Sequence, residues 1–338
     1  MLARGAGIAA GALADAVLGD PRRGHPVALF GSGAAELERH TYADARWAGA
    51  GHTAALLAAV GVAGALAERL ARRGGPAAEA AVMAAATFVA LGGTSLCATG
   101  DRMAALLAAG DVDAARGLLP SLCGRDPSVL DSPGLARAAL ESVAENTSDA
   151  TVAPLVWAAT AGVPGVLAYR AVNTLDAMIG HRNARYTRFG WAAARLDDLA
   201  NIVGARLTGA LVVVCAPLVG GSPRQAWRAW RRDAGKHPSP NAGVAEAAFA
   251  GALGVSLGGP TQYAHELEIR PTLGDGRPPD ADDLARAVRL SRAVQVLAAV
   301  LAASVSAAGR SGRRVSPRRC ARWCRRRRAP APSRGGAP

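Results

Sequence analysis

Six long apolar stretches place the strongest constraint on how this chain folds. They cover residues 1–19, 48–70, 77–99, 151–168, 199–221 and 287–308. About 20 apolar residues in a helix are enough to cross the hydrocarbon core of a bilayer. A soluble protein with alanine-rich core helices would also contain such stretches, but their number and the arginines between them favour a membrane protein. We therefore predict an all-α, multi-pass membrane bundle.

The positive charge is concentrated at the C-terminal end. The formal net charge is +13, but eleven arginines and no acid lie from Arg310 onward, so the rest of the chain is nearly neutral. The composition of this end predicts a disordered tail at residues 309–338, after a membrane domain at residues 1–308. By the positive-inside rule, the tail predicts a cytoplasmic C-terminus in the cell membrane. A solvated extension is the simpler interpretation of the tail than a nucleic-acid-binding segment, and no nucleic-acid partner is expected.

The first polar cluster lies in ESVAENTSDATVAPL, directly before the apolar stretch 151–168. It contains Glu141, Glu145, Asn146 and Asp149. Ionised groups beside an apolar segment are costly unless they are solvated, paired or used in function. Glu145 and Asp149 are four residues apart, which places both carboxylates on nearly one face of a helix. A simple solvated helix end is the alternative interpretation.

The second cluster lies in residues 169–209 and combines carboxylates, amides and arginines. Its members are Asn173, Asp176, His181, Arg182, Asn183, Arg195, Asp197 and Asp198. Carboxylate and amide oxygens are the hard ligands that Mg²⁺ prefers, and arginine binds phosphate or carboxylate in a bidentate manner. A lattice of salt bridges along a helix explains some of these residues but not the mixture of Asn, Asp and His.

The third cluster is RRDAGKHPSPNAG, in which Lys236 and His237 precede a turn that ends at Asn241. Lysine holds phosphate as a point charge, and histidine transfers protons near neutral pH. The sequence contains neither a P-loop nor a dinucleotide-binding glycine motif, so Lys236 by itself is weak support for a nucleotide site. A smaller fourth cluster contains Asp20 and His25.

The order of these clusters resembles that of the CobD/CbiB family of cobalamin-biosynthesis proteins. The resemblance is carried by GDP…HPVALFG, ESVAENTSDATVAPL, AYRAVNTLDAMIGHRNARYTRFGWAAARLDDLANIVGARLTG and RDAGKHPSPNAGVAEAAFAGALG, between about Gly19 and Leu290. It implies an integral membrane protein that carries out ATP-dependent amidation of the free propionate of (adenosyl)cobyric acid. The amine would be (R)-1-amino-2-propanol or its O-phosphate, and the product adenosylcobinamide or its phosphate. The resemblance is also compatible with association with other late enzymes of the corrinoid pathway, and it does not extend to the tail.

Residue types suggest roles within this implied reaction. Mg²⁺ is predicted to bind Glu145, Asp149, Asp197 and Asp198. Phosphate or carboxylate groups are predicted to bind Arg182, Arg195 and Lys236, and His237 or His181 is the predicted base. The remaining residues predicted to contact ATP are Asn146, Asn173, Asp176, Asn183 and Asn241.

A transporter or channel is the main rival class, with Glu145, Asp149 and Asp176 along an ion path. Either function meets a topological difficulty. If every apolar stretch crosses the membrane, the three clusters fall on alternating faces and cannot form one site. The stretch 151–168, with Pro154 and Pro164, is therefore expected to be re-entrant. A second irregularity, or access from within the bilayer, is needed to bring Lys236 past the stretch 199–221.

Overall fold

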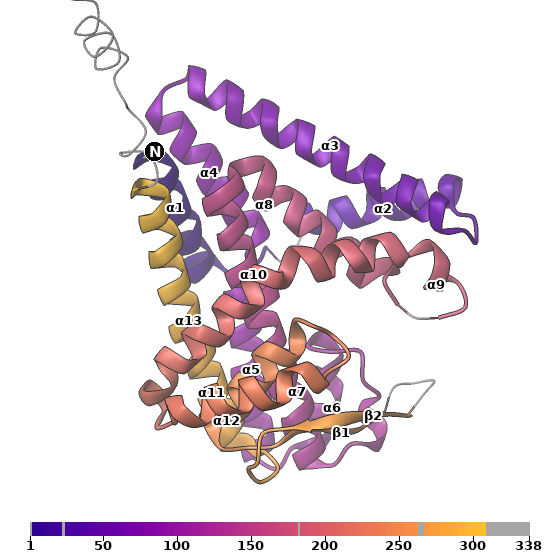
Figure 1. Ribbon diagram of the computed structural model, residues 1–338, viewed down its shortest axis with the longest axis vertical. Coiled ribbons are helices and arrows are strands. Elements are labelled where there is room, and N and C mark those ends of the chain that lie inside the picture. The colour runs from indigo at the N-terminus through magenta and orange to yellow at the C-terminus, as the bar shows by residue number, and fades with distance from the viewer. Residues whose placement is uncertain (1, 22–23, 182, 263–266, 309–338) are drawn as a thin grey trace, which may run out of the picture.

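The computed structural model describes residues 2–21, 24–181, 183–262 and 267–308 and is almost entirely helical (Figure 1). The predicted all-α class is confirmed. Five helical segments among the described residues are long and apolar enough to cross a membrane: Arg46–Arg73, Pro76–Ala108, Ser132–Ile179, Trp191–Val219 and Ala281–Ala308. They support a multi-pass membrane protein. Arg182 and the predicted tail lie outside the described residues.

The described part of the chain forms helices joined by short turns. The α-helices are α1 (Leu2–Leu18), α2 (Pro26–Thr41), α3 (Arg46–Arg73), α4 (Pro76–Ala90), α5 (Gly93–Ala108), α6 (Val112–Leu118), α7 (Ser132–Thr147), α8 (Ala153–Ile179), α9 (Tyr186–Phe189), α10 (Trp191–Cys215), α11 (Pro223–Asp233), α12 (Ala242–Leu253) and α13 (Ala281–Ala308). Short 3₁₀ turns are η1 (Leu119–Ser121), η2 (Pro127–Val129), η4 (Ala216–Val219) and η5 (Ala234–Lys236), and η3 (Ser148–Val152) is a π-helical turn. In Figure 1, α3 lies across the top, whereas α11, α12 and a β-hairpin lie at the bottom.

Three helices begin with a side-chain cap followed by a proline. The Asp131 carboxylate accepts a hydrogen bond from the Gly134 N–H at 2.8 Å, and Ser222 accepts one from Gln225 at 3.3 Å. The His25 ring accepts one from the Val27 N–H at 3.1 Å. Each cap satisfies a backbone donor that the first helical turn leaves without a partner, and proline in that turn loses no hydrogen bond. The sequence therefore fixes where α2, α7 and α11 start.

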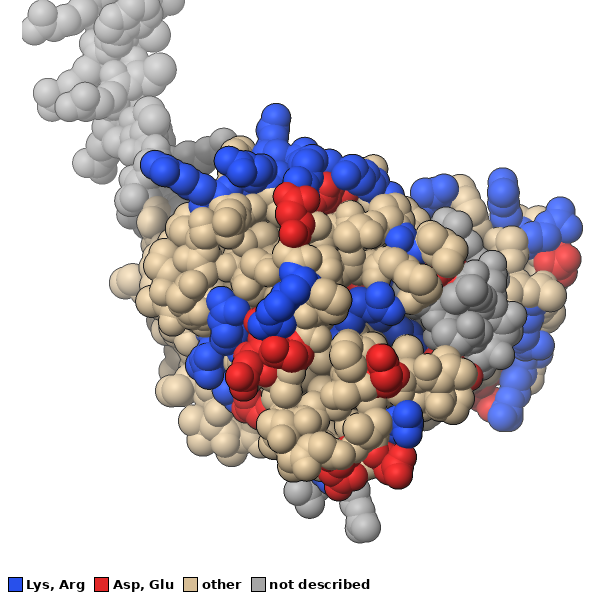
Figure 2. All heavy atoms as spheres, turned by 90° about the horizontal axis from the view of Figure 1, so that it is seen from below, with Lys and Arg blue, Asp and Glu red and all other residues tan. Residues whose placement is uncertain are grey.

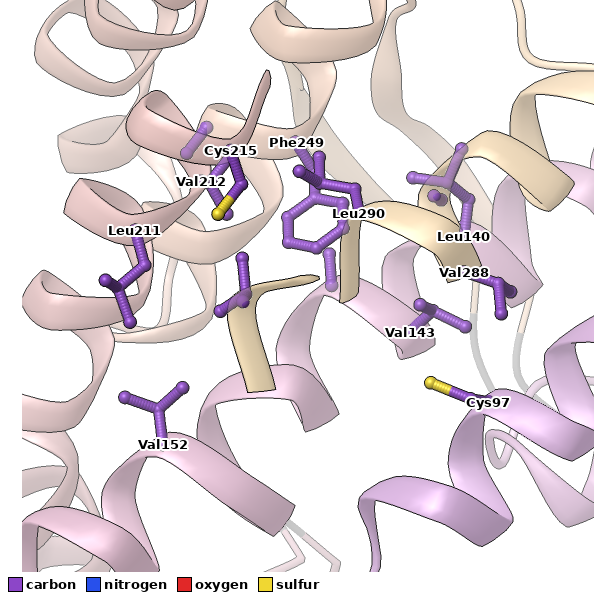
Figure 3. Close-up of a cluster of buried hydrophobic side chains, with 14 of the residues drawn as sticks. Cys97, Leu140, Val143, Val152, Leu211, Val212, Cys215, Phe249, Val288 and Leu290 are labelled. Atoms are coloured by element: carbon purple, nitrogen blue, oxygen red, sulfur yellow. The ribbon is translucent and has the colours of Figure 1, made fainter. Parts of the chain in front are cut away.

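The larger apolar core joins α1, α4–α8 and α10–α13. Figure 3 shows part of it, where Phe249 of α12 and Leu290 of α13 lie beside Cys215 and Val212 of α10. Small residues allow the helix backbones to approach closely, as in membrane bundles. At Gly204 of α10, for example, an added Cβ would lie 2.5 Å from the Ala153 Cβ. The alanine and glycine content of the sequence thus serves helix packing.

Helix α8 reverses its direction at Gly162. This residue has φ +72° and ψ −154°, a backbone region that is open essentially only to glycine. In a straight helix, Asp149 and Tyr169 would be separated by about 30 Å. Instead, the Tyr169 hydroxyl lies 2.9 Å from the carbonyl oxygen of Asp149. The segment therefore forms two antiparallel arms, residues 153–161 and 163–179, which is the reversal that a re-entrant segment requires.

The prolines of this segment have different roles. Pro164 follows the reversal by two residues, as the sequence predicted for a broken helix. Pro154 lies where the π-helical turn η3 passes into α8. The Ala150 carbonyl, to which residue 154 of an undistorted helix would donate, accepts a hydrogen bond from the Gly92 N–H at 3.1 Å instead.

A second return of the chain joins the third polar cluster to the second. After α10, η4 and Gly220 (φ +69°) lead into α11, which packs back along α10. The Asn241 amide then donates a hydrogen bond to the Asp198 carbonyl at 2.7 Å, and Arg206 donates one to the Asn241 side-chain oxygen at 2.7 Å. This return is the second irregularity that the sequence required.

A β-hairpin, which the sequence analysis did not predict, follows α12. Strands β1 (Leu257–Gln262) and β2 (Leu267–Leu273) are antiparallel, with an irregularity in register between Leu257 and Gly259. The Gly258 N–H donates a hydrogen bond to the Glu141 carboxylate at 2.7 Å, which fixes the hairpin to α7.

We predict that Gly162→Ala destabilises the protein, because a Cβ forces a backbone conformation that costs about 1–3 kcal/mol. The Cβ would also lie 2.8 Å from the Arg4 guanidinium. Thermal unfolding in detergent should show a lowered midpoint. The control is Gly61→Ala in α3, where a Cβ meets no atom within 4 Å and alanine favours the helix. Equal midpoints for the two variants would contradict the prediction.

Candidate functional site

The acids of the first cluster lie where α7 passes into the π-helical turn η3. Glu145 is in the last turn of α7, Asp149 is in η3, and both side chains are half-buried. The two carboxylates interact electrostatically, as their predicted spacing required. Single π-helical turns occur frequently at functional sites because they re-aim side chains within a helix.

Helix α10 contributes Asp197 to the same place. The Asp197 carboxylate accepts hydrogen bonds from the Asn201 amide at 3.0 Å and the Asn173 amide at 3.4 Å. The Tyr169 hydroxyl lies 2.7 Å from the Asn201 side-chain oxygen, so it connects α10 to the second arm of α8. Asp149 and Asp197 also interact electrostatically. The Asn173 and Asn201 amides therefore fix the orientation of the Asp197 carboxylate.

Asp176 completes a group of four half-buried acids with Glu145, Asp149 and Asp197, which we call the acidic centre. Asp176 interacts electrostatically with each of the other three, and the four acids come from three separate parts of the sequence. Asp198, the fourth predicted metal ligand, interacts electrostatically with Asp176 and Asp197 and also lies 3.7 Å from Arg195. All four predicted ligands therefore lie near Asp176, which the sequence assigned to ATP.

The acidic centre does not form a metal cage by itself. Among the described residues, no three His, Cys, Asp or Glu side chains lie close enough to hold an ion. Mg²⁺ at nucleotide sites usually takes one or two carboxylates, and phosphate oxygens and waters complete its coordination. The carboxylates of Glu145, Asp149 and Asp197 supply oxygen donors of the type that Mg²⁺ takes at such sites. Their role as Mg²⁺ ligands remains a prediction.

A second group of charged residues lies between α7, α12 and the hairpin. The Arg125 guanidinium forms an ion pair with Glu141, and both side chains are buried. Glu246 of α12 is buried and interacts electrostatically with Glu141, Glu145 and Arg270. The two groups therefore adjoin each other through Glu145.

His237 faces this second group. Its Nδ1 lies 3.0 Å from the Ser239 nitrogen and 3.2 Å from the Ser239 carbonyl oxygen, so it can accept a hydrogen bond from the first or donate one to the second. Its Nε2 lies 3.7 Å from the Glu246 carboxylate and has no hydrogen-bond partner among the described residues. Burial lowers the pKa of His237, and the positive charge of Arg270 lowers it further. The lowered pKa favours the neutral ring, and the role of His237 as a base remains a prediction.

Lys236 is held in an ion-pair network. Its ammonium lies 2.8 Å from the buried Asp233 carboxylate, which also accepts hydrogen bonds from Arg232 and from the Gly274 N–H. The Arg232 guanidinium holds the pKa of Asp233 well below its usual range, and Lys236 adds to this effect. The predicted phosphate-binding lysine is therefore half-exposed and paired.

The other predicted residues of the second cluster lie around a separate pocket. The pocket has a volume of about 260 Å³, and its lining includes His181, Arg195, Asp198, Arg46 and Trp191. The Asn183 side chain accepts a hydrogen bond from the Tyr186 N–H at 2.8 Å and so caps a turn at the start of α9. His181 is exposed, and it interacts electrostatically with Asp176 at the edge of the acidic centre.

Asn146 makes local contacts within its own helix. Its amide donates hydrogen bonds to the Ser142 carbonyl at 3.0 Å and to the Ser142 hydroxyl at 3.2 Å. These contacts orient the α7 end beside Glu145. A role for Asn146 in binding ATP remains a prediction.

The sequence analysis missed several residues of the site. Tyr169 and Asn201 both lie within the second cluster, but no pattern in the sequence indicated that their side chains are in contact. Arg170 interacts electrostatically with Asp149 and with Asp20 of the fourth cluster, and Asp20 lies 3.6 Å from His25. The GDP…HP motif in the sequence indicated Asp20 and His25. No motif indicated Arg125 or Arg270, because their partners come from distant segments of the chain.

Comparison with known proteins shows the family of this chain. The family described as CobD/Cbib protein matches residues 8–291, which include every described residue of the acidic centre. The chain belongs to this family. A relative named cobalamin biosynthesis protein CobD from Mycobacterium tuberculosis is 67% identical over 299 residues, which cover 88% of this chain and 95% of the relative. A relative of the same name from Geobacter metallireducens is 44% identical, with 90% and 97% covered. No solved structure matches this chain.

The buried Arg125–Glu141 pair should be essential for stability in this CobD/CbiB family member. We predict that Glu141→Ala lowers the free energy of unfolding by about 3–5 kcal/mol, because it removes the carboxylate that forms the buried ion pair and accepts the Gly258 N–H of the hairpin. Glu36→Ala, which removes the exposed pair with Arg39, should cost less than about 1 kcal/mol. Denaturant titration in detergent measures both. Similar losses would contradict the assignment of Glu141 as a structural anchor.

Proposed function

We propose that this protein is a membrane enzyme of cobalamin biosynthesis, a carbon–nitrogen ligase that amidates the free propionate of (adenosyl)cobyric acid. The donor is (R)-1-amino-2-propanol or its O-phosphate, and the reaction consumes ATP. Membership of the CobD/CbiB family and the name of its relatives support the pathway. We place the enzyme in the cell membrane, with the arginine-rich C-terminus on the cytoplasmic side.

The observation that carries this proposal is the convergence of Glu145, Asp149, Asp176 and Asp197. Four acids from three segments come together although each carboxylate repels the others. A fold would have little reason to assemble them for stability alone. A site that binds a cation together with phosphate gives a reason for the arrangement.

A carboxylate and an amine do not condense in water without activation. Ligases of this energetic class transfer a phosphoryl group to the carboxylate, and the amine then displaces phosphate. Mg²⁺, when bound, neutralises charge on the transferring phosphoryl group. One or two of the carboxylates of Glu145, Asp149 and Asp197 would hold it, and phosphate oxygens and waters would supply the other ligands.

Cationic side chains around the acidic centre suit the anionic substrates. Arg170 lies beside Asp149, and Arg195 lines the pocket next to Asp198. Guanidinium groups in these places would orient a phosphate or propionate oxygen. His237, whose Nε2 lies 3.7 Å from the Glu246 carboxylate, would be the base that accepts the proton of the attacking amine.

The proposal predicts that membranes containing this protein convert adenosylcobyric acid to a cobinamide product only with Mg-ATP and an aminopropanol donor. Chromatography with mass detection measures the product, and membranes without the protein are the control. Parallel assays with aminopropanol and its phosphate identify the donor. Product formation that continues undiminished after removal of ATP would contradict a ligase and support the alternative, a transporter with an intramembrane acidic site.

The acidic centre itself is tested by Glu145→Gln and Asp149→Asn. Each variant should insert normally but lose most turnover, and the Mg²⁺ concentration required for half-maximal activity should rise. The matched control is Glu36→Gln, an exposed carboxylate on α2. A solvated helix end would show reduced stability with normal activity per folded molecule. Normal activity and Mg²⁺ response in both variants would therefore contradict a catalytic role for these acids.

A further inference from the structure

The outer face of α11 carries three arginines that no described acidic side chain neutralises. Arg224, Arg228 and Arg231 are exposed and, at spacings of four and three residues, lie on one face of the helix. Arg232 differs, because it forms ion pairs with Asp233 and Asp275. Seen from the end of the molecule that carries α11, basic side chains gather along one edge of the surface (Figure 2). The helix thus presents concentrated positive charge.

Tryptophan accompanies this charge. Trp227 is 48% exposed, and the Arg231 guanidinium lies 5.6 Å from the centre of its ring. With Arg224, Arg228 and Arg232, these residues line an open pocket of about 630 Å³. Tryptophan is enriched at the headgroup level of membranes because its ring is amphipathic. Arginine and tryptophan together are therefore typical of a membrane–water interface.

The helix before α11 presents an apolar face to its surroundings. Leu199, Val203, Val214 and Leu218 are 64%, 61%, 64% and 73% exposed, and their spacing places them along one side of α10 and η4. An exposed apolar row of this length is expected where a helix faces lipid. Helix α11 starts five residues after Leu218 and packs back along α10, so its arginines and the apolar row belong to adjoining helices.

We propose that the Arg224, Arg228 and Arg231 face of α11 binds the phosphate groups of anionic phospholipids. Guanidinium groups form bidentate hydrogen bonds to phosphate, and a row of three matches several headgroups in a leaflet. The continuity with the apolar row selects a lipid rather than a soluble phosphate as the occupant. This proposal does not depend on the ligase reaction.

The test uses the full-length protein in nanodiscs of phosphatidylcholine with phosphatidylglycerol. Gln225 is exposed on α11 beside Arg228, and Gln225→p-benzoylphenylalanine places a photoreactive group there. After illumination, mass spectrometry counts the adducts with each lipid. We expect the ratio of phosphatidylglycerol to phosphatidylcholine adducts to exceed the nanodisc composition several-fold.

Two sets of arginine variants complete the experiment. Arg224→Gln/Arg228→Gln/Arg231→Gln should return the adduct ratio to the nanodisc composition. The control, Arg39→Gln/Arg102→Gln/Arg289→Gln, removes the same charge from exposed positions on three other helices and should keep the enrichment. The crosslink is local, so lipid bound elsewhere on the chain does not affect it. Lack of enrichment, enrichment that survives in the α11 variant, or its loss on addition of millimolar ATP or phosphate would each overturn the proposal.

Discussion

The reversal of the chain at Gly162 is the constraint on which the acidic centre depends. Without it, the two arms of α8 would form one rod, and Asp176 would lie about 40 Å from Asp149. The contact of Tyr169 with the Asp149 carbonyl and with Asn201 then holds the second arm and α10 at the π-helical turn. A single backbone conformation that only glycine adopts readily therefore places three segments of acids together.

Bringing these acids together has an electrostatic cost, and the structure offsets it unequally. Asp197 receives two amide hydrogen bonds, and Glu141 receives a guanidinium and a backbone N–H. Hydrogen bonds from the protein thus hold both of these acids in place. Glu145 interacts favourably with the Arg270 and Arg125 guanidinium groups and Asp149 with Arg170, but both acids are also repelled by neighbouring carboxylates. Bound cations would reduce this repulsion, which is why we assign them the direct role.

Local patterns in the sequence predicted part of the fold and part of the candidate site. Apolar length predicted the helices, and Pro164 predicted a break within one residue or two of Gly162. The chemical types of Glu145, Asp149 and Asp197 predicted acids that work together. Arg125, Arg270 and Asn201 were not predictable, because their roles come from contacts between residues far apart in the chain.

The path of α10 shows why apolar length alone does not define a membrane span. Residues 191–219 are long and apolar enough to cross, yet α11 packs back along them and returns the chain to Asp198. A helix with four arginines and an acid is too polar to accompany α10 through hydrocarbon. The two helices pack together, and the exposed apolar row of α10 is the face suited to lipid. The hydrogen bond between Asn241 and Asp198 joins the third polar cluster to the second, so the return of the chain, and not apolar length, decides which residues meet.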